Sequence, residues 1–281
     1  MVCAYHGGRA LNGDYNFPPF EECNSAMPWT FAHPAAVLPL RKLGLKHLSF
    51  AGLVVGSISP DIGYYIGRFD LAALAHTTLG VLILCLPTGL VLFALVRALH
   101  RPVANVLPEP HRSALLWMPQ VPRLTSLRVV FAVAVSIIIG AMTHNAWDSF
   151  THPAGYMVSK LPLLRQSVGV VATRDFLVYE LLQHVSTLFG LSIVAVAYVK
   201  WLKRAKMSHT SPRPSSDRWR YALLFSLLAG SAIMAAPLAY QMYGTTNGAV
   251  RFVRVIICAT SIFAVALCLV SVLLSYRRIE N

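Results

Sequence analysis

A few acids and histidines lie in or beside long apolar runs of this chain, where ionisable side chains are rare. The sequence contains only 11 Asp and Glu in 281 residues. Ionisable groups inside membrane-spanning segments are costly, and they usually face a cavity, a partner or an ion. We therefore predict that these residues form one buried polar site, with a divalent metal ion as its expected occupant. The set comprises His33, Asp61, His76, His144, Asp148, His152 and His184.

The stretch from His144 to His152 carries the strongest chemical signal. His144, Asp148 and His152 follow one another at intervals of four, which aligns their side chains along one face of a helix. Neutral imidazole and carboxylate suit zinc, which is the expected ion, with Mn, Fe or Mg as alternatives. A hydrogen-bonded network at a helix end, stopped by Pro153, is the other interpretation.

Asp61 and His76 lie where apolar segments end or begin. Asp61 closes the stretch Gly56-Ser57-Ile58-Ser59-Pro60-Asp61, whose small residues allow helices to approach closely. We predict that Asp61 and His76 are both metal ligands. The alternatives are that Asp61 caps the following turn and that His76 is an interfacial or helix-packing histidine.

His33 and His184 complete the expected site. The stretch at 31–35, Phe-Ala-His-Pro-Ala, is similar to Phe-Thr-His-Pro-Ala at 150–154, a match too short to prove duplication. His184 follows Glu180 by four residues, so a satisfied pair on one helix is the alternative to a functional role. The predicted metal ligands are His33, Asp61, His76, His144 and Asp148, and the predicted catalytic residues are Asp61, Asp148, His152 and His184.

Composition indicates an all-α, polytopic membrane helix bundle. The chain is 56% hydrophobic and 12% charged, whereas soluble domains carry about 25% charged residues. About six stretches approach the length needed to cross a bilayer. The five cysteines have no metal or redox spacing, and we expect at most one disulfide, between Cys3 and Cys23. The expected spans are 48–66, 71–99, 129–147, 176–199, 221–243 and 252–275.

Lysine and arginine are distributed unevenly among the connections. With six spans, alternate regions hold 18 and 6 of these residues, and the positive-inside rule then places both termini in the cytoplasm. The site residues from Asp61 to His184 would lie near the non-cytoplasmic face. His33 reaches that level only if residues 34–45 form a short re-entrant or interfacial helix that folds back on 48–60. This hairpin would leave the N-terminus on the outer side.

The chain divides by composition into four parts. Residues 1–26 form a polar extension without the apolar core of a signal peptide, and Met27 is an alternative start. A site-bearing membrane domain at 27–199 precedes a basic cytoplasmic loop at 200–220 and a C-terminal helix pair at 221–281. The net charge of +13 is spread over loops beside apolar segments, which is typical of membrane topology and excludes nucleic acid as the expected partner.

Several motifs in order make the chain resemble the DUF4184 family of uncharacterised bacterial membrane proteins. The motifs occupy 27–36, 56–61, 76–80, 144–152 and 183–184, and the resemblance covers nearly all of residues 27–275. The layout is also distantly similar to membrane-bound metal-dependent hydrolases related to zinc-dependent phospholipase C. That likeness assigns no place to His152 or His184. It implies ligand or acid–base roles for His33, Asp61, His76, His144 and Asp148.

The expected function is that of a metal-dependent hydrolase in the cell membrane, acting on a lipid-like or phosphoester substrate. A bound ion would activate water, with a carboxylate as base. One alternative is a lyase or cyclase for an isoprenoid, although the Asp-rich motif for diphosphate binding is missing. Another is a transporter or scaffold with a polar network, although no paired halves with broken helices are visible. The sequence has no P-loop, GxGxxG, GxSxG or HExxH motif, and it does not indicate an oligomeric state.

Overall fold

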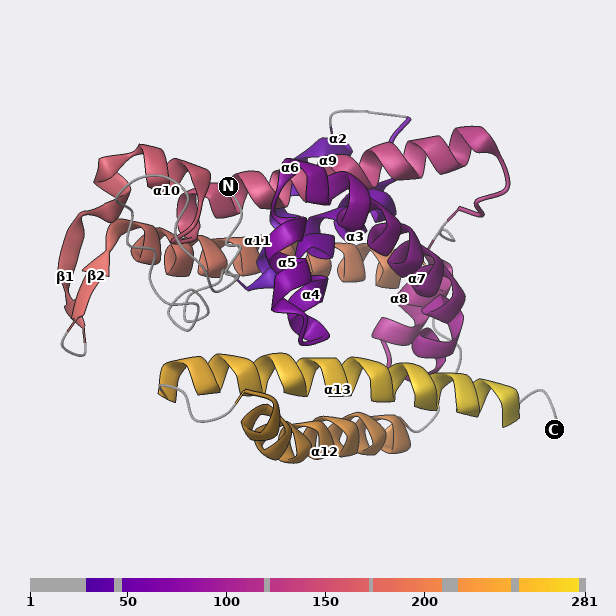
Figure 1. Ribbon diagram of the computed structural model, residues 1–281. Helices are drawn as coiled ribbons and strands as arrows, with labels where there is room; N and C mark the ends of the chain where they lie inside the picture. Colours follow the sequence, from indigo (N-terminus) through magenta and orange to yellow (C-terminus); the bar gives the residue numbers. More distant parts are fainter. Residues whose placement is uncertain are drawn as a thin grey trace. The chain divides into compact units, whose positions relative to one another are not determined.

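A computed structural model describes residues 29–42, 47–118, 122–171, 174–208, 217–243 and 248–277 (Figure 1). The expected extension at 1–26, with Met27 and the Cys3–Cys23 disulfide, lies outside the described residues. The described part is almost entirely helical, which confirms the expected all-α class.

The N-terminal third is built from short helices. In order these are η1 (Thr30–Ala32), α2 (Pro34–Lys42), α3 (Phe50–Ile58), η2 (Ser59–Asp61), α4 (Ile62–Tyr65), α5 (Phe69–Ala75) and α6 (Thr78–Gly80). A π-helical turn, η3 (Val81–Cys85), then leads into α7 (Leu86–Val106), α8 (His111–Trp117), α9 (Leu127–Thr151), α10 (Tyr156–Lys160) and η4 (Pro162–Arg165). The chain continues through β1 (Ser167–Val171), β2 (Arg174–Leu177), α11 (Val178–Ser208), α12 (Arg218–Tyr243) and α13 (Gly248–Arg277).

Five of the described helical segments are long and apolar enough to cross a membrane, and they match five of the six expected spans. The remaining expected span, 48–66, is divided into α3, η2 and α4, because Pro60 interrupts the helical hydrogen bonds. With nine residues, α3 is only about 13 Å long. The total number of spans therefore stays a prediction. The five segments are Thr78–Val106, Leu127–Lys160, Val178–Ala205, Arg218–Gln241 and Arg251–Tyr276.

Two connections differ from the sequence-based expectation. β1 and β2 pair antiparallel in the polar connection after α9, and strands of five and four residues are too short to carry a clear periodic signal. α11 continues as far as Ser208, into the stretch 200–220 that we expect to be a cytoplasmic loop.

The chain folds into two compact units, each made of two separate stretches. The first comprises Met1–Gly89 and Phe131–Val194, and the second comprises Leu90–Val130 and Ala195–Asn281. The unit boundaries cut through α7, α9 and α11. The domain boundaries expected at 26, 199 and 220 stay a prediction.

Within the first unit, α3 and α9 approach one another through glycines. A methyl group added at Gly56 would lie 2.2 Å from the carbonyl oxygen of Ile137, and one added at Gly140 would lie 2.2 Å from that of Leu53. Such backbone-to-backbone contact fixes the position of α3 along α9. Consequently Asp61, which follows α3, is held beside the C-terminal half of α9.

The helices α2 and α3 form the expected hairpin. They pack against one another, and Thr30, which precedes α2, donates a hydrogen bond to Asp61, which follows α3. His33 therefore returns to the level of Asp61, which confirms the expected geometry of the hairpin. Its position relative to the membrane stays a prediction.

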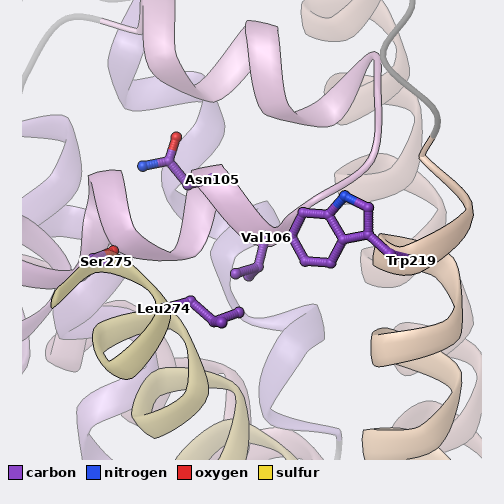
Figure 2. Close-up of a pocket in the computed structure, with 5 residues that line it drawn as sticks. All are labelled: Asn105, Val106, Trp219, Leu274 and Ser275. Carbon is purple, nitrogen blue, oxygen red and sulfur yellow. The ribbon is translucent and has the colours of Figure 1, made fainter. Parts of the chain in front are cut away.

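In the second unit, α12 and α13 lie side by side (Figure 1). Ala235, Ala239 and Cys258 form an apolar core between them. A cavity of about 40 Å³ in this unit is lined by Asn105, Val106, Trp219, Leu274 and Ser275, whose side chains are drawn in Figure 2. None of these lining residues is ionisable, and the volume suits a water molecule rather than a lipid.

Candidate metal centre

Four ionisable side chains from three parts of the chain meet in the first unit. Asp61 ends the turn η2 after Pro60 has stopped α3. His76 lies at the end of α5, and His144 and Asp148 lie one turn apart on α9. One nitrogen or carboxylate oxygen from each residue lies within 4.8 Å of all the others. This geometry confirms the predicted convergence of the four residues, which we call the four-ligand group.

The distances within the four-ligand group resemble those of a tetrahedral metal shell. Nε2 of His76 lies 3.2 Å from Nε2 of His144 and 3.2 Å from Oδ2 of Asp148. Nε2 of His144 lies 3.1 Å from the same oxygen. Oδ1 of Asp61 lies 3.4 Å from Nε2 of His144 and 3.5 Å from Nε2 of His76. Tetrahedral ligands about 2.0–2.2 Å from zinc lie ~3.3–3.6 Å from one another, so these five separations are close to those of a shell around one small cation.

Hydrogen bonds on the far side of each imidazole determine which nitrogen is free. Nδ1 of His144 lies 2.8 Å from the carbonyl oxygen of Ser57, and Nδ1 of His76 lies 2.8 Å from that of Ala72. A carbonyl oxygen can only accept, so each Nδ1 carries the hydrogen, and in the neutral ring Nε2 keeps a lone pair. With both rings neutral, the two Nε2 lone pairs face one another between two carboxylates. A bound cation would relieve their repulsion, as would protonation of a ring.

The carboxylate of Asp61 is oriented in the same way, by a hydrogen bond from outside the group. Oγ1 of Thr30 donates to Oδ2 of Asp61 at 2.5 Å, which leaves Oδ1 directed at the two histidines. Asp61 and Asp148 are 2% and 6% exposed. Burial of a charged carboxylate costs several kcal/mol unless it is paired, and a shared cation would remove that cost because carboxylate and neutral imidazole are its natural ligands.

Exposure differs within the four-ligand group. His144 is completely buried, whereas the side chain of His76 is 20% exposed and is the most accessible of the four.

His33 adjoins the four-ligand group. Its ring stacks on that of His144, with centroids 3.7 Å apart, and its Nε2 lies 3.5 Å from Oδ1 of Asp148. Among the described residues, neither ring nitrogen of His33 nor this oxygen has a hydrogen-bond partner. His33 is not one of the four atoms that share the shell, and its role as a further metal ligand stays a prediction.

The two remaining predicted catalytic histidines do not join the four-ligand group. His152 comes directly after the end of α9, and its Nδ1 accepts a hydrogen bond from the backbone N–H of Ala154 at 3.3 Å. His184 is exposed and stacks on Phe176, with ring centroids 6.0 Å apart. His184 therefore lies outside the buried group, and the catalytic roles expected for His152 and His184 stay predictions. Successive residues of a helix point in different directions, and α11 buries Gln183 instead.

Sequence reasoning missed two polar residues near these positions. Thr30 holds Asp61, and its position three residues before His33 in the expected motif was the available signal. Gln183 is 1% exposed, and its Oε1 has no hydrogen-bond partner among the described residues. The backbone carbonyl groups of Ser57 and Ala72 could not be predicted as partners of the histidines, because every residue carries a carbonyl group.

The fold and site together define a helical membrane protein with a buried two-histidine, two-aspartate group that can hold a metal ion. The chain belongs to the DUF4184 family, described as a domain of unknown function, whose family model matches residues 27–276. No curated protein and no solved structure shows significant similarity to the chain.

Proposed function

We propose that the protein is a metal-dependent hydrolase of the cell membrane, with zinc as its ion and a lipid-like or phosphoester substrate. The observation that supports this proposal is the pair of imidazole Nε2 atoms, 3.2 Å apart, that face one another between Asp61 and Asp148. Imidazole nitrogen and carboxylate oxygen are both ligands that zinc accepts.

The proposal assigns separate tasks to the two carboxylates. Catalytic zinc sites use three protein ligands and keep one position open, whereas structural sites use four. Asp61, His76 and His144 are the three proposed ligands, because each is fixed from behind by a hydrogen bond. Asp148 is the proposed general base, because its Oδ1 has no hydrogen-bond partner among the described residues.

A divalent cation held by Asp61, His76 and His144 would supply Lewis acidity, which lowers the pKa of water and polarises a carbonyl or phosphoryl oxygen. Asp148 would accept a proton from the attacking water through a carboxylate oxygen. His33, whose Nε2 lies 3.5 Å from Oδ1 of Asp148, orients that carboxylate. The surrounding helices exclude bulk water, and His76 borders the path by which the scissile group enters.

Metal analysis combined with a hydrolysis assay tests this function. We expect purified protein to contain about one zinc per chain and to hydrolyse members of a panel of fluorogenic lipid esters and phosphodiesters. Asp148→Asn should retain most of the metal and lose turnover at least ~100-fold, as is typical when a general base is removed. His144→Ala should lose both metal and turnover, and Thr143→Val, whose hydroxyl donates to the carbonyl oxygen of Gly140, should keep both.

The possible negative results have distinct meanings. Stoichiometric metal without hydrolysis of any member of the panel would contradict catalysis and favour a structural or transport role. Absence of metal from active or inactive protein would contradict the metal centre itself.

A further inference from the structure

The C-terminal end of α5, where His76 lies, has backbone carbonyl groups that need partners. The last turn of any helix leaves its carbonyl oxygens without donors in the helix itself. The carbonyl oxygen of Ala72 accepts hydrogen bonds from the backbone N–H and from Nδ1 of His76. That of Leu74 accepts from the backbone N–H and the hydroxyl of Thr77. These bonds shape the local turn, but they do not tie His76 to the other three ligands.

The carbonyl oxygen of Ala75, in contrast, is held from other elements. Nδ2 of Asn145, on α9, donates to it at 3.2 Å. Sγ of Cys85, at the end of the π-helical turn η3, donates to it at 3.4 Å. A carbonyl oxygen can only accept, so the side-chain amide of Asn145 presents its NH2 group to Ala75. Ala75 and Cys85 are buried, so bulk water does not compete for this oxygen.

The hydrogen bond from Asn145 lies beside the contact between two ligands. Asn145 follows His144 in the chain, and Ala75 precedes His76. The Nε2 atoms of these two histidines lie 3.2 Å apart. His144 and Asp148 belong to one helix, which fixes their spacing. α5 packs mainly against α4, α6, η2 and η3, so the bond from Asn145 gives α5 a directional link to α9.

We propose that Asn145 is a positioning residue, which sets the place of His76 in the metal shell through the carbonyl group of Ala75. This inference rests on the proposed function, because it takes His76 to be a metal ligand. Metal–ligand distances vary by only ~0.2 Å in well-formed sites. Without the bond, the end of α5 is free to shift along α9, and even a small shift weakens the hold of His76 on the ion.

A purely structural role, in which Asn145 only helps to pack α9, is the competing explanation. Ala141, about one turn before Asn145 on α9, belongs to the same apolar cluster as Ala75 and Cys85. Apolar contact is non-directional, so this cluster holds the elements together without fixing the orientation of His76. The two roles therefore differ in one respect. A positioning residue affects metal binding only while His76 is present, whereas a structural residue affects it regardless.

A double-mutant cycle on zinc affinity separates the two roles. Asn145→Leu keeps the approximate size of the side chain but removes the donor. We expect the zinc affinity of the full-length protein, measured by chelator competition, to fall roughly tenfold, at the lower end of the range for residues that orient metal ligands, because Asn145 acts through the backbone. In a His76→Ala background, the same substitution should leave the remaining affinity unchanged. Thr143→Val, the matched control on α9, should have no effect in either background.

Hydrogen exchange of the metal-free protein gives a readout that does not depend on the ion. Asn145→Leu should accelerate exchange of the backbone amides at 72–80 roughly 3–10-fold, the factor that corresponds to one hydrogen bond, and should leave α12 and α13 unchanged. Cys85→Ala removes the weaker donor to the same carbonyl oxygen. It should have the same local effect at a smaller size, and it takes the place of Asn145→Leu if that variant does not fold.

The outcomes separate this inference from the proposed function. An equal fall in zinc affinity with and without His76, or unchanged exchange at 72–80, would overturn the role of Asn145. Zinc-binding wild-type protein whose affinity does not respond to Asn145→Leu would contradict that role alone. Wild-type protein that binds no zinc would instead contradict the metal centre, and zinc binding without hydrolysis would contradict only the hydrolase function.

Discussion

At the scale of single residues, the candidate centre depends on which atoms are already engaged. His76 and His144 each donate Nδ1–H to a backbone carbonyl, and Thr30 engages one oxygen of Asp61. The remaining atoms are Nε2 of each histidine and Oδ1 of Asp61, and they face one another. Such outer hydrogen bonds orient metal ligands and raise their affinity for the ion.

Thr30→Val tests the outer hydrogen bond directly. The substitution keeps the shape of the side chain but removes the hydroxyl that fixes Asp61, so we expect zinc affinity to fall by about 10–100-fold. Competition with a fluorescent chelator measures this affinity. Thr143→Val is the matched control, and an unchanged affinity in Thr30→Val would show that Asp61 is not a ligand.

The residues of the site were predictable to the extent that their side-chain types are unusual in apolar segments. Asp61, His76, His144 and Asp148 satisfy this condition, and the structure brings them together. Threonine is common in membrane helices, so the side-chain type of Thr30 is not unusual, and only its place in the motif before His33 pointed to it. His184 satisfies the condition but is exposed, because its neighbour Gln183 occupies the buried face of α11.

At the scale of helices, close contact between α3 and α9 positions Asp61 beside His144. Gly56→Ala should disturb this contact, because the new methyl group would lie 2.2 Å from the carbonyl oxygen of Ile137. We expect a loss of about 1–3 kcal/mol in stability, measured as a lower thermal unfolding temperature in detergent, together with weaker zinc binding.

Gly230→Ala on α12 is the control for this substitution. No atom lies within 4 Å of the added methyl group, and alanine is the better helix former by about 0.5–1 kcal/mol. The unfolding temperature should therefore stay unchanged or rise. Equal stability of the Gly56 variant and the wild type would contradict the close packing of α3 on α9.

The long helices were predictable from the sequence, and the short ones were not. Apolar runs place α9, α11, α12 and α13 near their observed ranges. The expected span 71–99 is instead divided near Thr77, whose hydroxyl accepts a hydrogen bond from Gly80 N–H and so begins a new helix. A hydropathy window long enough to detect a membrane span averages over many residues, so it does not detect a helix boundary set by one local hydrogen bond.

At the scale of the whole molecule, the uneven distribution of Lys and Arg predicts sidedness. Lys160 and Lys203 are both exposed; Lys160 precedes α11, and Lys203 lies near the C-terminal end of the apolar segment Val178–Ala205. Single cysteines at these positions should react from opposite sides with an impermeant maleimide, with Lys203 on the cytoplasmic side because that connection is the more basic. Reaction of both positions from one side would contradict the assignment of α11 as a span.

X-ray absorption spectroscopy of the purified protein tests the central claim most directly, because it measures the ligands of the ion itself. We predict zinc with nitrogen and oxygen neighbours at about 2.0–2.2 Å, including the outer-shell scattering of two imidazole rings from His76 and His144. The imidazole signal should disappear together with the zinc in a variant that carries His76→Ala and His144→Ala. Protein without metal, or zinc whose spectrum lacks two imidazoles, would contradict the assignment of these four residues as one metal centre.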